Sequence, residues 1–175
     1  MMQRDELQIK LAELHSDSYA WAVRCCAGDN LVAEEVLQES YLKVLRKIRG
    51  FKAQASFKTW FFAIIRYTAI DYIKAKAKRK TLRIEDQVGD LSMLQPTTDS
   101  ALDNRQLQLI FRQALAQLSP QQKQTLHLVF YQNCSIQEAA DIMGIQVGTA
   151  RTHYERGKNR LRQLLDKEGI LKQMI

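Results

Sequence analysis

The sequence predicts an all-α protein made of two small helical domains that a flexible linker joins. Glycine and proline are scarce, at 7 and 2 of 175 residues, and such a composition favours helices over sheets and turns. Apolar residues recur at helical spacing in both halves of the chain. Between the halves, residues 81–99 lose this periodicity and gain Gly, Pro, Thr and Asp, which is typical of a linker. We therefore predict domains at residues 1–80 and 100–175.

The N-terminal domain is predicted to form a bundle of four helices. One helix spans about residues 31–49, after Asp29 and its neighbours as turn and cap residues. Its apolar residues at i, i+4, i+7 and i+11 share one face, namely Leu37, Tyr41, Val44 and Ile48. A longer helix spans about residues 57–80, and its apolar stripe begins with Phe57, Trp60, Phe61 and Ile64. Helical regions around residues 7–14 and 18–27 complete the bundle.

In the C-terminal domain, serine N-caps mark the beginnings of the first two predicted helices. Ser100 precedes a helix that extends to about Gln117, and the inward residues of this helix are Leu102, Ile110, Phe111 and Ala114. The segment Ser119-Pro120-Gln121-Gln122 supplies an N-cap, a Pro at N1 and a Gln at N3, which is a strong start signal. The buried face of the helix that it opens comprises Leu126, Val129 and Phe130.

A helix-turn-helix is predicted at the end of this domain. Ser135-Ile-Gln-Glu138 is a capping box that opens a short helix, and Gly144 ends that helix where a positive φ is wanted. The apolar stripe of the next helix is Val147, Ala150, Tyr154, Gly157, Leu161 and Leu164, which favours a core role for Tyr154. The opposite face of its N-terminal half carries Thr149, Arg151, Thr152, His153, Glu155 and Arg156. Such a half-helix can read base edges in the major groove of DNA.

Basic residues gather in two blocks of a chain whose net charge is +7. Residues 51–83 carry nine basic and one acidic side chain, and residues 121–175 carry eight and five. The intervening residues 84–120 carry two basic and five acidic side chains. Two basic blocks separated by an acidic segment predict two surfaces that meet a polyanion, whereas a merely solvated surface would mix both signs.

Composition excludes other classes of protein. No apolar run approaches the roughly 20 residues of a membrane span and no charged-then-apolar leader opens the chain, so we expect a cytoplasmic protein without stable membrane insertion. Cys25, Cys26 and Cys134 lack the spacing of a disulfide framework, which predicts reduced and partly buried thiols. A metal site that included His15 would lack the usual ligand spacing. We therefore expect neither a metal nor a cofactor.

Three segments together resemble bacterial RNA polymerase sigma factors of the extracytoplasmic-function (ECF) group. "AEEVLQESYLKVLRKIRGF" at 33–51, followed by "SFKTWFFAIIRYTAIDYI" at 56–73, is similar to their region 2. "SIQEAADIMGIQVGTARTHYERGKNRLR" at 135–162 is similar to their region 4. The resemblance covers about residues 8–80 and 104–166. The order of the two regions, their spacing and the linker between them all fit.

The resemblance implies a protein without independent catalysis. Such proteins bind core RNA polymerase, direct it to promoter DNA and help to open the duplex, and an anti-sigma factor is an expected partner. In the family, the helix that matches residues 34–47 docks on the large polymerase subunit. Glu35, Gln38 and Glu39 stand at the matching D/E-x-x-Q-E positions and are the implied core-binding residues. The alternative is that these side chains are solvated and only interact favourably with the helix dipole.

The loop at 51–56 and the start of the following helix match the part of the family that captures the opened minus-ten element. An extruded base needs an aromatic or apolar pocket and nearby cations. Phe51 stands at a matching pocket position, whereas the place of Trp60 in the apolar stripe favours the core. A run of basic residues follows at positions 74–80. The resemblance implies that it neutralises DNA phosphates, and the alternative is a merely solvated surface. Its members are Lys74, Lys76, Lys78, Arg79 and Lys80.

The sequence departs from the family pattern in each region. Tyr67 stands where Asn is usual; a Tyr can stack on an extruded base but cannot copy the paired hydrogen bonds of an amide, and packing between helices is its alternative role. Arg151-Thr152-His153 replaces a basic-Ser-Arg element, so a guanidinium and a hydroxyl are kept while His153 weakens a charge contact at neutral pH. The implied minus-thirty-five contacts are Thr149, Arg151, Thr152, His153 and Arg156.

Two other functions compete with that of a promoter-specificity subunit. A free-standing helix-turn-helix regulator with an N-terminal sensing bundle would bind duplex DNA tightly on its own, but a ligand pocket would not need the basic and aromatic block at 51–80. An enzyme is disfavoured because no phosphate-binding loop is present and no His or Cys pairs convincingly with a carboxylate at helical spacing.

Overall fold

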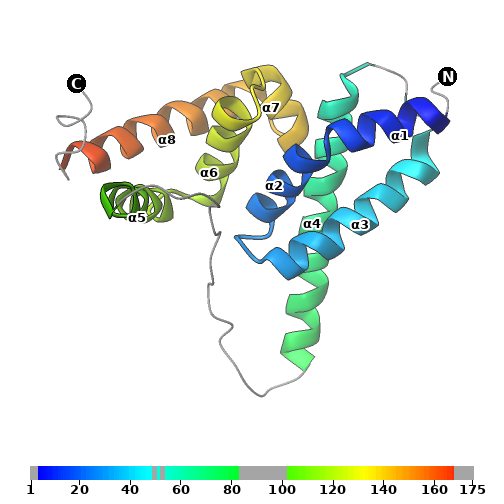
Figure 1. The fold of residues 1–175 in the computed structure, drawn as a ribbon, viewed down its shortest axis with the longest axis horizontal. Helices are drawn as coiled ribbons and strands as arrows, with labels where there is room; N and C mark the ends of the chain where they lie inside the picture. Colours follow the sequence, from blue (N-terminus) through cyan, green and yellow to red (C-terminus); the bar gives the residue numbers. More distant parts are fainter. Residues whose placement is uncertain (1–3, 49–50, 52–53, 83–101, 168–175) are drawn as a thin grey trace. The chain divides into compact units, whose positions relative to one another are not determined.

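The computed structural model describes residues 4–48, 51, 54–82 and 102–167. Helices account for nearly all of these residues and none of them lies in a strand, so the predicted all-α class is confirmed. The chain divides into two compact units. Helices α1 to α4 belong to the first unit, whereas α5, α6, η2, α8 and α7 as far as Ala140 belong to the second (Figure 1). The predicted linker lies outside the described residues, apart from positions 81 and 82 at the end of α4.

The first unit contains the four predicted helices. They are α1 (Arg4–Glu13), α2 (His15–Cys25), α3 (Asn30–Lys47) and α4 (Phe57–Leu82). The start of α3 is the one that the sequence predicts, because the Asp29 carboxylate accepts a hydrogen bond of 3.1 Å from the backbone N–H of Val32. Gly28 precedes this cap with φ of +93°, a conformation that glycine adopts without strain.

The core of the first unit forms where α2, α3 and α4 pack on one another (Figure 1). Trp21 of α2 is fully buried, and its ring lies 6.1 Å from that of Phe62 on α4. The indole N–H donates a hydrogen bond of 3.0 Å to the backbone carbonyl of Phe62, so the polar atom of this large side chain is satisfied inside the core. Val36 and Val44 bring α3 to the same core.

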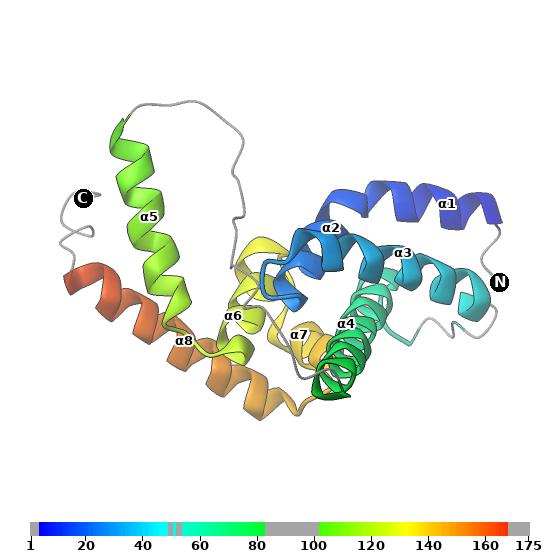
Figure 2. The same cartoon turned by 90° about the horizontal axis from the view of Figure 1, so that it is seen from below.

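The second unit contains α5 (Leu102–Ala116), α6 (Pro120–Leu126), the π-helical η2 (His127–Tyr131), α7 (Ile136–Met143) and α8 (Val147–Lys167). Helices α5 and α6 both pack against α8 (Figure 2). Both predicted capping boxes are formed: Ser119 with Gln122 opens α6, and Ser135 with Glu138 opens α7. Gly144 follows α7 with φ of +64°, as predicted, and α8 begins three residues later.

Two aromatic residues predicted to lie in the core of this unit are exposed. Phe130 is 61% exposed because η2 is π-helical, with the N–H of Gln132 donating to the carbonyl of His127 five residues earlier. The wider turn rotates the side chains that follow away from the face of α6. Phe111 of α5 is 43% exposed, whereas Ala114 on the same helix is buried. The predicted inward position 102 lies outside the described side chains.

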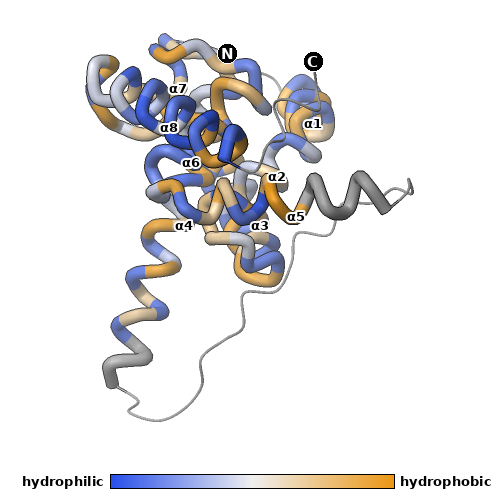
Figure 3. The backbone as a smooth tube through the Cα atoms, turned by 90° about the vertical axis from the view of Figure 1, so that its left-hand side faces the viewer, coloured by the Kyte–Doolittle hydropathy of each residue, from blue (hydrophilic) through white to orange (hydrophobic). Residues whose placement is uncertain are grey.

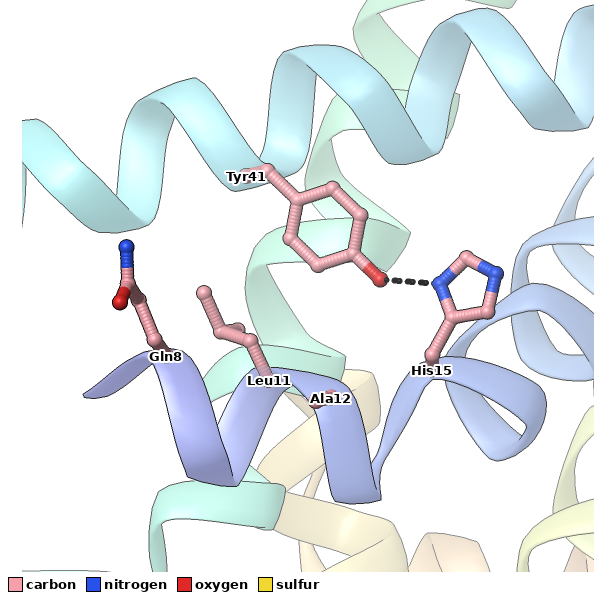
Figure 4. Close-up of a pocket in the computed structure, with 5 residues that line it drawn as sticks. All are labelled: Gln8, Leu11, Ala12, His15 and Tyr41. Carbon is pink, nitrogen blue, oxygen red and sulfur yellow. Dashed lines mark hydrogen bonds between the residues drawn. The ribbon is translucent and has the colours of Figure 1, made fainter. Parts of the chain in front are cut away.

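The three cysteines are buried, and none of the three forms a disulfide. Burial raises the pKa of Cys25 and raises that of Cys26 to about 12, so both side chains are protonated thiols at neutral pH. His15 does not join them. Its Nδ1 lies 2.8 Å from the hydroxyl of Tyr41, at a small open pocket that Gln8, Leu11 and Ala12 also line (Figure 4). Within the described ranges, no three His, Cys, Asp or Glu side chains form a potential metal-binding group.

The capping box of α6 leads to the first prediction. Ser119→Ala should lower the stability of the second unit by about 1 kcal/mol, because the backbone N–H of Gln122 loses its acceptor at 3.2 Å. Thermal unfolding followed by circular dichroism measures this change. The same substitution at Ser16, an exposed residue in the first turn of α2 that is not its N-cap, is the control and should be close to neutral. Equal melting of the Ser119→Ala and parent proteins would contradict the prediction.

Candidate functional site

The outer face of α3 carries the acidic and amide residues that the sequence singles out. Glu35, Gln38 and Glu39 are exposed, whereas their neighbours Val36 and Leu37 are buried. Helical spacing produces this division, since Val36, Leu37, Ser40 and Val44 form the face that packs inward. Glu35 also has a tertiary contact: its Oε2 accepts a hydrogen bond of 2.5 Å from the hydroxyl of Tyr72 on α4.

Three leucines on the same face of α3 were not among the predicted site residues. Leu31 is 75% exposed, Leu42 is 46% exposed and Leu45 is 49% exposed. Leu42 and Leu45 stand four and seven positions after Gln38, so they continue its row along the helix. The sequence could have indicated that these leucines are exposed, because they share the spacing of Gln38 and are absent from the inward apolar stripe of the helix. The face of α3 thus combines carboxylates with an apolar row, a combination suited to binding another protein.

An aromatic cluster lies at the start of α4. The ring centroid of Phe51 is 4.9 Å from that of Trp60 and 6.0 Å from that of Phe57. Phe57 is buried, whereas Phe51 and Trp60 are half-buried. Trp60 is therefore at the boundary of the core rather than within it. Half-buried rings that pack on one another keep a fixed position and still offer a free surface, which is what stacking on a base requires.

Tyr67 and the lysines extend this surface along α4. Tyr67 is 51% exposed, and it lies seven residues after Trp60 and seven before Lys74. Seven residues are almost two helical turns, so the three side chains share one face at intervals of about 10 Å. Lys74, Lys76 and Lys78 are exposed, and Lys76 lies 3.9 Å from the carboxylate of Asp29. Arg79 and Lys80 belong to α4, but their side chains lie outside the description.

The N-terminal half of α8 presents polar side chains, and the hydrophilic character of this helix is visible in Figure 3. Thr149, Arg151 and Arg156 are exposed, while His153 is half-buried. Thr152 is exposed, but its hydroxyl donates a hydrogen bond of 2.9 Å to the backbone carbonyl of Gly148. Thr152 can therefore accept a further hydrogen bond more readily than it can donate one.

Close packing on α6 holds α8 in place. Ala150, Gly157 and Leu164 are its buried residues. A Cβ atom at Gly157 would lie 3.1 Å from the side chain of Leu126 and 3.2 Å from that of Gln122, so glycine permits the close approach of the two helices. Tyr154, predicted to be core, is half-buried and stacks at 5.6 Å on the exposed ring of Phe130. The two units thus contain a helical bundle with an aromatic-basic face and a helix-turn-helix.

Comparison with known proteins identifies both units. Residues 11–79 match the family described as Sigma-70 region 2, and residues 108–161 match the family described as Sigma-70, region 4. The chain is 28% identical over 171 residues to the ECF RNA polymerase sigma factor SigX of Bacillus subtilis, and this alignment covers 93% of this chain and 84% of SigX. It is 27% identical over 157 residues to the ECF RNA polymerase sigma factor BldN of Streptomyces coelicolor, covering 89% of this chain and 59% of BldN.

A solved structure has the same fold. The sigma factor RpoE of Bartonella quintana, crystallised with the anti-sigma factor NepR, matches with a TM-score of 0.77 and 23% sequence identity, over 92% of this chain and 97% of RpoE. The chain therefore belongs to the sigma-70 family, within its ECF group. It is a promoter-specificity subunit, which binds core RNA polymerase and promoter DNA. These matches do not favour a free-standing regulator with a sensing bundle.

Proposed function

We propose that this sigma factor acts through three separate surfaces in its two units. The outer face of α3 binds core RNA polymerase through Glu35, Gln38 and Glu39. The aromatic-basic face of α4 binds the opened minus-ten element, and the N-terminal half of α8 binds the minus-thirty-five element. The domains that we propose are residues 1–80 and 100–175, with residues 81–99 as the linker. The protein acts by binding alone, without catalysis of its own, and works in the cytoplasm where core polymerase meets DNA.

The observation that carries this proposal is the arrangement of α4. Half-buried Trp60 at its start, exposed Tyr67 seven residues later, and exposed Lys74 and Lys78 beyond share one face of the helix, whereas Lys76 lies on the other side, near Asp29. An opened strand needs both kinds of contact, because its bases lose their stacking partners while its phosphates remain charged. Phe51 and Tyr67 offer rings for bases. Lys74, Lys76 and Lys78, with Arg79 and Lys80 after them in the sequence, offer cations for phosphates.

The second DNA surface has the chemistry of base readout. Arg151 is exposed near the start of α8, where a forked guanidinium can reach the edge of a guanine. Thr149, Thr152 and His153 are polar side chains of the same half-helix, and Arg156, five residues after Arg151, is proposed to contact a phosphate.

An anti-sigma factor is a further proposed partner. RpoE, the structural relative described above, was solved with one bound. A protein that covered the α3 face would prevent docking on polymerase. The exposed leucines of that face give such a partner apolar surface to bury.

In-vitro transcription tests the proposed function directly. Core RNA polymerase is mixed with this protein and a library of promoter sequences, and the transcript starts are sequenced. We expect starts that depend on the protein and that share upstream and minus-ten elements. Core polymerase alone is the control. Tight, specific binding of the protein alone to duplex DNA, without any dependent transcript start, would contradict the proposal.

The role of Arg151 makes the second prediction. Arg151→Ala should weaken recognition of the minus-thirty-five element by about 1–3 kcal/mol, with the loss concentrated at one base position, if the guanidinium makes a bidentate contact with a base. Competition binding of the holoenzyme to single-base promoter variants measures this effect. Arg162→Ala, at an exposed position on the C-terminal half of α8, is the matched control. A uniform loss across all upstream sequences would reassign Arg151 to the DNA backbone.

A further inference from the structure

A hydrogen bond joins the proposed polymerase-binding helix to the proposed DNA-binding helix. The hydroxyl of Tyr72 on α4 donates to Oε2 of Glu35 on α3, at 2.5 Å and across 37 positions of sequence. Glu35 is exposed and Tyr72 is half-buried. One turn earlier on α4, Thr68 accepts a hydrogen bond of 3.1 Å from Nζ of Lys43 on α3. Two side-chain links therefore fix α3 against this face of α4.

The contact restricts a side chain that would otherwise be mobile. An exposed glutamate on a helix samples several rotamers, and binding a partner must select one of them. A hydrogen bond from a neutral hydroxyl holds the carboxylate while leaving its negative charge intact, and it occupies only part of the accepting capacity of the two oxygens. Glu35 can thus be oriented by Tyr72 and still accept a hydrogen bond or ion pair from a partner protein.

We propose that Tyr72 is a positioning residue for core RNA polymerase: its hydroxyl holds the carboxylate of Glu35 in the orientation in which polymerase binds it. This inference rests on the proposed role of Glu35. Tyr72 acts through Glu35 and touches neither polymerase nor DNA. It lies five residues after Tyr67, about 140° further around α4, so the positioning face and the base-stacking face are distinct.

The test measures binding of the full-length protein to core RNA polymerase at equilibrium, with a fluorescent label on the protein. Tyr72→Phe removes the hydroxyl and keeps the ring, and it should weaken binding roughly twofold to tenfold, the range set by ordering one side chain. Tyr19→Phe, a half-buried tyrosine of α2 in the same unit, is the matched control and should bind normally. Melting temperatures of both variants should stay near that of the parent.

The double variant separates positioning from a general structural role. In a Glu35→Ala background, the further change Tyr72→Phe should have no effect on polymerase binding, because the group that the hydroxyl orients is gone. An equal loss in both backgrounds would overturn the proposal. So would tighter binding by Tyr72→Phe, which would mean that the hydroxyl competes with polymerase for Glu35.

Failure of the proposed function gives a different result. If Glu35→Ala binds core polymerase as the parent does, Glu35 is not a contact, and the proposed polymerase surface and the positioning role of Tyr72 both fall. If Glu35→Ala weakens binding while Tyr72→Phe does not, the surface stands and only the positioning role is wrong.

Discussion

Charge reversal at both Glu35 and Glu39 is expected to weaken binding to core RNA polymerase by roughly 30-fold or more. Both carboxylates are exposed on α3, beside the leucines of the same face. Replacing each with lysine turns an attraction into a like-charge contact, and such contacts cost several kcal/mol at protein interfaces. A loss of about 2 kcal/mol already corresponds to about 30-fold. Equilibrium binding of the labelled protein to core enzyme measures the change.

The fold should survive this substitution, because neither residue is buried and α3 keeps its inward face. Circular dichroism and a thermal melt verify this point. Glu6→Lys with Glu13→Lys is the matched control, since it makes the same change in net charge on the exposed surface of α1. If the Glu35 and Glu39 variant has native helicity and binds polymerase normally, the two residues are outside the interface.

The features that the sequence predicted well are those that depend on short-range physics. A capping box needs only residues three apart, and the boxes at Ser119 and Ser135 are both formed. The turn after α7 needs one residue with a positive φ, which Gly144 supplies. Helical periodicity in α3 separated the inward Leu37 and Val44 from the outward carboxylates.

The features that the sequence could not predict depend on contacts between distant residues or on an irregular turn. Periodicity assumes a regular helix, so the π-helical turn at 127–131 placed Phe130 on the wrong face. A stripe of apolar residues does not show how far along a helix its packing partner extends, and Phe111 of α5 is 43% exposed. The contact of Tyr72 with Glu35 joins helices at positions 37 apart, which no local pattern encodes.

Tyr67 carries the prediction with the next largest effect. Tyr67→Ala should lower open-complex stability by about 1–3 kcal/mol, the usual range for a base on an aromatic platform, whereas Tyr67→Phe keeps the ring and should open promoters nearly normally. The side chain is 51% exposed, while Thr68 and Ala69 beside it are buried. Losing an exposed ring should therefore change protein stability by no more than about 0.5 kcal/mol. Permanganate footprinting on a matched promoter, alongside thermal melts, measures both effects.

The substitution Tyr67→Asn distinguishes stacking from base readout at the same position. It restores the amide that is usual in the family and removes the ring, so it should exchange a sequence-tolerant contact for paired hydrogen bonds to one base. We expect Tyr67→Asn to change which minus-ten base is preferred, whereas Tyr67→Ala should weaken opening on every sequence alike. A promoter library varied at the minus-ten positions separates these outcomes. If Tyr67→Ala melts early and its folded fraction opens DNA normally, the ring stabilises the bundle and does not stack on a base.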